Sequence, residues 1–265
     1  MSVHAPNVVS AQARALRHRK NVEALSPTQL DTLRRAFAAV EAIGDDRGFA
    51  HWAGIHGLPL PMYCQHGTRL FLPWHRAYLY FFELALRDQV PEAALTWWDW
   101  TSAASHTSGI PAAFATARVG GQPNPLFRTQ VPPVARINGQ PRQTSRAPHP
   151  PSELPTTAEV QRVLGLPDFL DFQQQLEDIH NGVHGWVGGT MGQIAWAAYD
   201  PIFWAHHTMI DRLWRLWQIR HPNPVLPSSL LNQALPPFPM TVAETLDIFA
   251  LGYRYAAATT HAVVP

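Results

Sequence analysis

Two histidines four residues apart carry the strongest chemical signal in the sequence. His180 and His184 fall within the segment 168–187, whose apolar residues recur at helical spacing, so the imidazoles lie one turn apart on one helix face. Two nitrogen atoms placed in this way can chelate one metal ion. The pair lies in an apolar stripe with Leu176 and Val187, where an imidazole without a partner carries a desolvation cost. We therefore expect a metal site here, the alternative being one histidine hydrogen-bonded in the core and one that faces water.

Other histidines lie on further segments of the chain and could face the same site. They are His56 and His66 in an irregular segment, His75 in the first turn of a predicted helix, and the doublet His206-His207 one turn into another. Adjacent residues of a helix point about 100° apart, so we expect only one member of the doublet to face a shared site. The spacing does not decide which. Six histidines from four segments are enough for two facing sites with three imidazoles each.

The choice of metal is narrowed by the other residue types near these histidines. Imidazole suits zinc, copper, iron and nickel. A zinc site is less natural, because no carboxylate or second thiolate is placed to complete it. Glu177 and His180 form the Glu-x-x-His pattern of di-iron carboxylate bundles, but that fold needs a second copy, which we do not find in the sequence. A di-iron protein therefore stays only as an alternative.

The composition is that of a folded protein with little net charge. The chain has 265 residues, of which 46% are hydrophobic and 15% charged, far from the profile of disordered chains. Its net charge of +1 gives no reason to expect nucleic acid or a membrane surface as a partner. One cysteine excludes an intrachain disulfide. We find no signal peptide and no apolar run of about 18 residues, so we expect a cytoplasmic protein, with export assisted by a partner as the alternative.

Four helices are predicted to position the histidines. Apolar periodicity and capping residues place these helices at 28–43, 73–89, 168–187 and 201–221. Glycines and prolines make 48–69 irregular, and the basic segment 10–20 is expected to be a surface helix or a loose arm. Prolines exclude long helices from 101–167, which we expect to wrap the core in short helices and turns. The expected fold class is therefore mainly α, a four-helix bundle with long irregular Pro-rich loops, in a single domain of residues 1–265.

Six motifs lie between about residues 50 and 215. They are Gly54-Ile55-His56-Gly57-Leu58-Pro59, Tyr63-Cys64-Gln65-His66-Gly67, Phe71-Leu72-Pro73-Trp74-His75-Arg76, Trp97-Trp98-Asp99-Trp100, His180-Asn181-Gly182-Val183-His184 and Asp200-Pro201-Ile202-Phe203-Trp204-Ala205-His206-His207. Together they resemble the motifs of the type 3 (coupled binuclear) copper proteins, which include tyrosinases, catechol oxidases and molluscan haemocyanins. The chain looks like a bacterial-like, single catalytic domain of this family.

The resemblance implies a helical bundle that holds two copper ions and uses dioxygen as co-substrate. The implied ligands are His56, His66 and His75 for the first copper, and His180, His184 and His207 for the second. His51 is a rival of His56, because some bacterial relatives space the first two histidines more widely. The implied activity is that of a tyrosinase, which hydroxylates small monophenols to o-diphenols and oxidises o-diphenols to o-quinones.

The resemblance also assigns roles beside the copper ligands. Cys64 matches a cysteine that fungal tyrosinases and molluscan haemocyanins join to the second ligand by a thioether, so we predict a Cys64–His66 crosslink. Glu177, with Asn181, is expected to hold a water that takes the phenol proton. The rim of the substrate pocket is expected to contain Gly185, Met191, Gln193 and Ile194.

The end of the sequence carries one more family feature. Tyr253-Arg254-Tyr255 resembles the tyrosine motif that closes the catalytic domain, and Arg19 is expected to pair with it. Only ten residues follow, so we expect no C-terminal shielding domain, and a site open without proteolysis unless a copper-loading or shielding partner covers it.

Asp211 is expected to orient an imidazole or to pair with Arg212 or Arg215.

Other functions stay open beside the tyrosinase reaction. A catechol or o-aminophenol oxidase without strong monophenolase activity would use the same copper chemistry. A haemocyanin-like oxygen carrier is the alternative from another class, although such carriers are normally large multi-unit chains. Histidines outside the motifs are predicted at the surface: His4, His18, His106, His149, His221 and His261.

Overall fold

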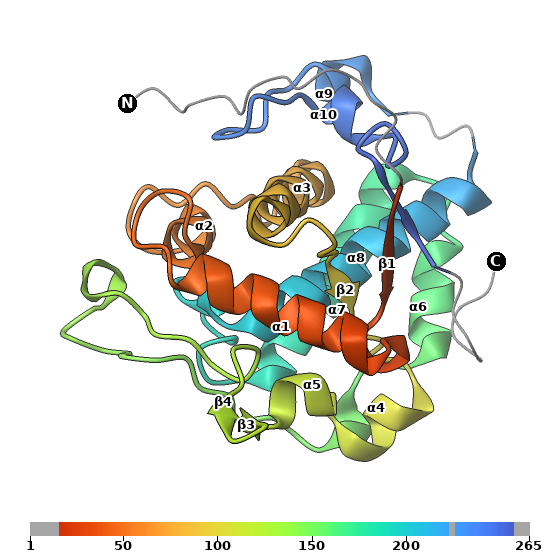
Figure 1. Ribbon diagram of the computed structural model, residues 1–265. Helices are drawn as coiled ribbons and strands as arrows, with labels where there is room; N and C mark the ends of the chain where they lie inside the picture. The colour runs from red at the N-terminus through yellow and green to blue at the C-terminus, as the bar shows by residue number, and fades with distance from the viewer. Residues whose placement is uncertain (1–15, 223–225, 257–265) are drawn as a thin grey trace.

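Four long helices form the centre of the molecule, as expected for a mainly α fold. The computed structural model describes residues 16–222 and 226–256. The four helices are α1 (Pro27–Glu41), α3 (Phe71–Gln89), α7 (Phe169–Val187) and α8 (Pro201–Arg220). Figure 1 shows α1 crossing in front of α8 and α7, with α3 beside them.

Local sequence signals explain where these helices begin. Ser26 and Gln29 form a capping box ahead of α1, with Pro27 at its first position. Asp200 accepts a hydrogen bond from the Ile202 backbone N–H at the start of α8. The bounds of α1, α7 and α8 lie within two residues of those predicted, and α3 begins two residues before Pro73, which its first turn tolerates.

A helix also forms where an irregular segment was predicted. The segment Phe49–His56 is helix α2, so the prediction of irregular backbone over 48–69 is wrong at its start. Gly54 was taken as a helix breaker. It serves instead for close packing, because a Cβ on Gly54 would lie 3.2 Å from the Pro59 ring. The consequence is that His56 lies at the end of a helix whose last turn, from Ala53 onward, is buried.

The N-terminal basic segment is not a loose arm where the structure describes it. Residues Arg17–Asn21 form strand β1, which pairs in parallel with β5 (Tyr253–Tyr255) on one side and β2 (Thr96–Trp97) on the other. The side chains of Arg17 and Arg19 are buried, whereas His18 between them is exposed. The alternation of buried arginines with an exposed histidine is the side-chain pattern of a strand. We had predicted a solvated segment because arginines are charged.

Short elements make up the Pro-rich segment and the tail. They are α4 (Ala103–Ser108), α5 (Ala112–Ala115), β3 (Arg118–Val119), β4 (Gln122–Pro123), α6 (Thr157–Leu164), α9 (Ser228–Leu231) and α10 (Val242–Thr245). The Pro-rich segment wraps the core in short helices and turns, as predicted (Figure 1). Arg146 fastens it to the start of α8 by an ion pair with Asp200 at 2.5 Å. Within the described residues, no helix is long and apolar enough to cross a membrane.

Candidate metal centre

Seven histidines of the described chain meet where α2, α3, α7 and α8 converge. They are His56 on α2, His66 on the loop that follows it, His75 on α3, His180 and His184 on α7, and His206 and His207 on α8. Rings from different helices lie in direct contact: His75 stacks on His207 with ring centroids 4.5 Å apart, and His66 stacks on His180 at 5.6 Å. The sequence segments that we expected to face one site therefore do so.

Three imidazole nitrogens converge in the half of the centre formed by α7 and α8. The Nε2 atom of His207 lies 3.1 Å from Nε2 of His180 and 3.2 Å from Nε2 of His184. These nitrogens, with one from His206, all lie within 4.8 Å of one another. A shared metal ion would accept all three lone pairs, whereas hydrogen bonds among neutral imidazoles could not satisfy all of them.

The outer nitrogens of two rings fix which nitrogen faces inward. Nδ1 of His75 lies 2.8 Å from the Phe71 carbonyl oxygen, and Nδ1 of His184 lies 2.8 Å from the Met191 carbonyl oxygen. A carbonyl oxygen only accepts, so Nδ1 carries the proton and Nε2 presents its lone pair. This is the arrangement by which proteins orient metal-binding histidines.

The other half of the centre contains His56, His66 and the cysteine. Ligand atoms of His56, Cys64 and His66 lie within 4.8 Å of one another, and so do those of His56, His75 and His207. His207 therefore lies between the two halves. The rival His51 lies outside both groups: its side chain is exposed and packs edge-on against Trp52.

The unpaired nitrogens in this half of the centre fit a metal ion. Both ring nitrogens of His56 and Nε2 of His75 are buried without a hydrogen-bond partner. Burial lowers the pKa of all seven imidazoles, to about 4 for His66 and His184. They are therefore neutral at pH 7 and able to donate lone pairs. A donor set of imidazoles, with one thiol at its edge, is one that copper accepts.

The structure brings both members of the doublet into the centre. We expected only one of His206 and His207 to face it, but each offers a nitrogen to the group that contains His180 and His184. The two side chains still point about 100° apart on the helix. Both reach the centre because rings from α7 lie between them: the ring centroids of His184 and His180 are 4.9 Å and 5.1 Å from that of His206.

Known proteins share both the sequence pattern and the fold. The family model "Common central domain of tyrosinase" matches residues 46–220. The tyrosinase of Streptomyces lincolnensis is 35% identical over 181 residues, which cover 60% of this chain and 66% of that one. Haemocyanin units G and H of Sepia officinalis are 32% identical over 235 residues, 81% of this chain and 40% of that protein.

Solved structures agree with these matches. A functional unit of octopus haemocyanin superposes with a TM-score of 0.79 at 28% identity, covering 91% of this chain and 68% of that one. The tyrosinase of Burkholderia thailandensis has the same fold, with a TM-score of 0.80 at 23% identity over 95% of this chain and 76% of that one. This chain belongs to the tyrosinase family of type 3 copper proteins. It spans less than half the length of the Sepia protein that it matches.

Glu177 of this tyrosinase-family chain is buried beside the histidines. Its Oε1 atom accepts a hydrogen bond of 2.6 Å from the backbone N–H of Gly67, the residue after His66. Burial raises the pKa of the carboxyl, and the Gly67 N–H partly opposes this. The side chain thus joins α7 to the loop that carries His66. Asn181 is exposed, and its Oδ1 lies 3.1 Å from Nδ1 of His180.

The four predicted rim residues have different surroundings. Met191 is buried and contributes only its carbonyl, whereas Gly185, Gln193 and Ile194 are exposed. A Cβ on Gly185 would meet nothing within 4 Å, so the surface beside His184 is open. Of the four, only Gln193 lines a shallow pocket of about 350 Å³, together with Ile137, Gln140, Pro141, Ser145, Gly189, Thr190 and Trp196.

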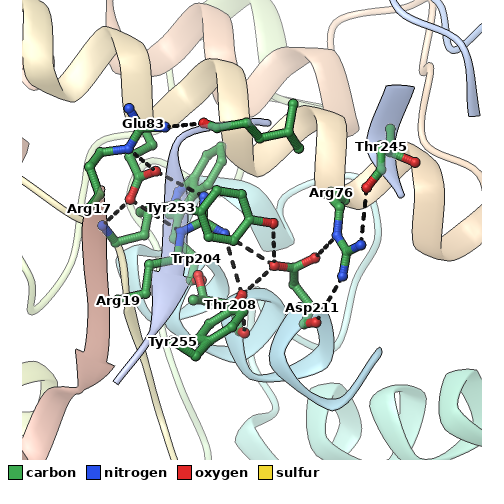
Figure 2. A network of polar contacts seen from close by, with 12 residues as sticks. Arg17, Arg19, Arg76, Glu83, Trp204, Thr208, Asp211, Thr245, Tyr253 and Tyr255 are labelled. Atoms are coloured by element: carbon green, nitrogen blue, oxygen red, sulfur yellow. Dashed lines mark hydrogen bonds and ion pairs between the residues drawn. The ribbon is translucent and has the colours of Figure 1, made fainter. Parts of the chain in front are cut away.

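Asp211 lies at the middle of a buried polar network that ties the helices together. We had expected it to orient an imidazole or to pair with Arg212 or Arg215. It pairs instead with Arg76 at 2.5 Å and with Arg19 at 3.2 Å (Figure 2). Burial opposes its ionisation, but these two guanidinium groups outweigh burial and hold the pKa of Asp211 below its usual value.

The tyrosine motif completes this network. The hydroxyl of Tyr253 donates to Oδ2 of Asp211 at 2.8 Å, and that of Tyr255 donates to the same carboxylate (Figure 2). The Arg19 guanidinium lies 3.6 Å from the centre of the Tyr253 ring and binds Glu83 of α3 at 3.0 Å. The predicted contact between Arg19 and the motif is therefore present. We call Arg19, Arg76, Glu83, Asp211, Tyr253 and Tyr255 the Asp211 network.

The remaining histidines lie away from the centre. His18 and His149 are exposed, as predicted. His106 and His221 are half-buried, and each places a ring nitrogen 3.1 Å from a backbone carbonyl oxygen, that of Pro155 and that of Leu164. The prediction that these two are surface residues is therefore wrong in part, because each ring is held against a segment far away in the sequence. His4 and His261 lie outside the described residues.

Proposed function

We propose that this protein is a binuclear copper oxidase that hydroxylates monophenols to o-diphenols and oxidises o-diphenols to o-quinones with dioxygen. The observation that carries the proposal is that two sets of histidines share His207. Several of their ring nitrogens are buried and have no other partner. Membership of the tyrosinase family supports the choice of copper.

Six histidines are proposed as the ligands. The first ion is held by His56, His66 and His75, and the second by His180, His184 and His207. The ions, when bound, supply the activation of dioxygen. The chain itself supplies rigid ligand positions, because the carbonyl oxygens of Phe71 and Met191 hold two of the rings by their outer nitrogens.

Glu177 is proposed to take the phenol proton. Its Oε1 atom is engaged by the Gly67 N–H, which leaves Oε2 as the acceptor, either directly or through a water held with Asn181. A carboxyl whose pKa is raised by burial is a better base than an ordinary surface glutamate. Asn181 and Gly185 are exposed next to ligands on the same helix, which supports entry of the substrate along this face of α7.

Small phenols are the proposed partners of this site. The uncharged residues Gly185, Gln193 and Ile194 favour neutral aromatic rings at the rim rather than a particular charged substituent. Catechols and o-aminophenols fit the same chemistry, so an oxidase without strong monophenolase activity differs from the main proposal only in the first step. A separate copper-loading or shielding partner is compatible with the exposed face of α7.

Reversible dioxygen binding is the second candidate function. It is favoured by the haemocyanin relatives, whose identity to this chain is close to that of the tyrosinase from Streptomyces lincolnensis. A carrier needs the same ligands but no entry for a phenol. The open surface beside Gly185 therefore argues for the oxidase.

Copper loading followed by substrate oxidation tests the proposal. The metal-free protein is loaded with Cu(II), its metal content is measured, and oxygen uptake and product are followed with tyramine, catechol and 2-aminophenol. We expect two copper ions and uptake with tyramine and catechol. His75→Ala should lose more than about 100-fold in activity, and the control His51→Ala should not change. Oxygen binding with no turnover of any phenol would support the carrier instead, and a failure to bind copper would contradict both.

A further inference from the structure

His206 is a fully buried histidine for which the proposed copper site has no use. Its side chain has no exposed surface, and neither Nδ1 nor Nε2 makes a hydrogen bond of good geometry, the nearest polar neighbour being the backbone of His180. His56 is the other described histidine with both nitrogens unpaired and buried, and it already belongs to the first copper site. A buried polar group without a partner destabilises the fold, so a second imidazole in this state calls for a ligand.

The position of His206 identifies that ligand. One of its nitrogens lies within 4.8 Å of ligand atoms of His180, His184 and His207. Its ring is parallel to that of His180, at 14° and 5.1 Å, and almost perpendicular to that of His184, at 81° and 4.9 Å. Nitrogens that share one ion at about 2.0–2.1 Å lie some 3.4 Å apart, so the separation of at most 4.8 Å places this nitrogen close to the range needed for a shared ion.

His207 and His206 differ in which clusters of potential metal ligands they belong to. The nitrogen of His207 is close to His56 and His75 as well as to His180 and His184, so it is shared by both halves of the centre. His206 belongs to the second half alone. A metal ion can therefore be held by His180, His184 and His206 while His207 remains among the residues of the first site.

We propose that His206 is an auxiliary metal ligand of the second site, which holds the incoming ion with His180 and His184 before His207 completes the site. The inference rests on the proposed binuclear copper centre. It explains why two adjacent histidines are both turned toward one group of imidazoles. The ion is exchanged between nitrogen lone pairs, so no bond of the chain is made or broken and no electron is transferred.

A comparison of variants measures this role without relying on activity. Metal-free protein is titrated with Cu(II) against a competing chelator, and the number of bound ions and the affinity of each are determined. We expect two ions in the unsubstituted protein and still two in His207→Ala, because His206 takes the place of the missing ligand. The double variant His206→Ala/His207→Ala should lose the second ion or bind it at least about tenfold more weakly than His207→Ala does.

The controls separate a ligand from a packing residue. His51→Ala/His207→Ala, which removes an exposed histidine instead, should match His207→Ala. His206→Gln/His207→Ala keeps a polar side chain of similar size and should still lose the second ion, and circular dichroism confirms that each variant is folded. Equal affinity for the second ion in His207→Ala and in both His206 double variants would overturn the inference. If the unsubstituted protein binds no copper, the proposed function fails as well; if it binds two, only the role of His206 is refuted.

Discussion

At the scale of single residues, the hydrogen bonds on the outer ring nitrogens decide what the histidines can do. His75 and His184 each donate from Nδ1 to a backbone carbonyl oxygen, which leaves Nε2 with a free lone pair. The sequence motifs predicted which histidines come together. They could not predict His206, because helical spacing gives the angle between neighbouring side chains but not the width of the site between them.

Glu177→Gln tests the proposed proton acceptor. The amide oxygen can still accept the Gly67 N–H, but the side chain can no longer take a proton from a monophenol. We expect kcat for tyramine to fall by about 100-fold and kcat for catechol by much less, because general-base catalysis is typically worth about 10²–10⁴-fold. Steady-state oxygen uptake measures both.

An exposed acid at the start of α7 provides the control. Asp171→Asn should leave the oxidation of both substrates unaffected. Equal losses for tyramine and catechol in Glu177→Gln would contradict the role of Glu177 as the acceptor of the phenol proton.

The Cys64–His66 crosslink is a second prediction at this scale. Cys64 is a free cysteine whose sulfur lies within 4.8 Å of ligand atoms of His56 and His66, and burial raises its pKa to about 11. Forming a carbon–sulfur bond removes one hydrogen from the thiol and one from the imidazole, and dioxygen would be the two-electron oxidant that takes up both hydrogens as hydrogen peroxide. Intact mass spectrometry after copper loading should therefore show a chain lighter by two hydrogens, and Cys64→Ser should show no such loss. An unchanged mass in the loaded protein contradicts the crosslink.

At the scale of secondary-structure elements, one ion pair joins α3 and α8, two of the four helices that converge at the site. Arg76 follows His75 on α3, and Asp211 lies one turn after His207 on α8. The stacked rings of His75 and His207, 4.5 Å apart, lie next to this bond. The Asp211 network therefore fixes the spacing between ligands of the two proposed copper ions.

Removal of this charge should be costly for stability. Asp211→Asn leaves the buried Arg76 guanidinium without a carboxylate and Arg19 with Glu83 alone, and breaking a buried pair in this way typically costs about 3–5 kcal/mol. Urea unfolding of the metal-free protein measures the loss. Asp31→Asn breaks the exposed pair with Arg35 and should cost less than about 1 kcal/mol. A loss in Asp211→Asn no larger than this control would contradict the role given to the network.

Helices and strands differed in how well the sequence predicted them. The four long helices follow from local signals, such as the cap at Ser26 and the apolar stripe of α7, so their bounds could be predicted closely. Strand β1 could not, because its partner Tyr253–Tyr255 lies at the other end of the sequence and no local pattern encodes the pairing. The ion pair between Arg76 and Asp211 was missed for the same reason. Arg76 follows His75 and Asp211 lies one turn after His207, so a site that joins these two histidines could have predicted the pair.

At the scale of the whole molecule, segments far apart in the sequence enclose a centre built of uncharged imidazoles. Strands β1 and β5 hold the two ends of the described chain beside α3 and α8, and Arg146 fastens the Pro-rich segment to α8. This packing buries five of the seven histidines and half-buries His66 and His184. Protonating any of the seven would place a positive charge in this poorly solvated centre, so all seven are neutral in the folded protein.

The metal-free protein should therefore lose stability as the pH falls. The pKa of each of these histidines is lowered in the fold, to about 4 for His66 and His184, so below about pH 6.5 the unfolded chain binds more protons than the folded one. Stability then falls with decreasing pH, by up to about 1.4 kcal/mol per pH unit for each histidine. Urea unfolding at several pH values between 7.5 and 5.5 should show this steep decline. A flat profile would mean that these histidines are not buried as neutral groups.

The central claim is that the centre holds two copper ions that act together on phenols. The most direct test is to add Cu(II) stepwise to the metal-free protein and to follow bound copper and catechol oxidation in the same samples. The account predicts saturation at two ions per chain, with activity that appears only as the second ion binds. Saturation at one ion, or full activity with one ion bound, would contradict it.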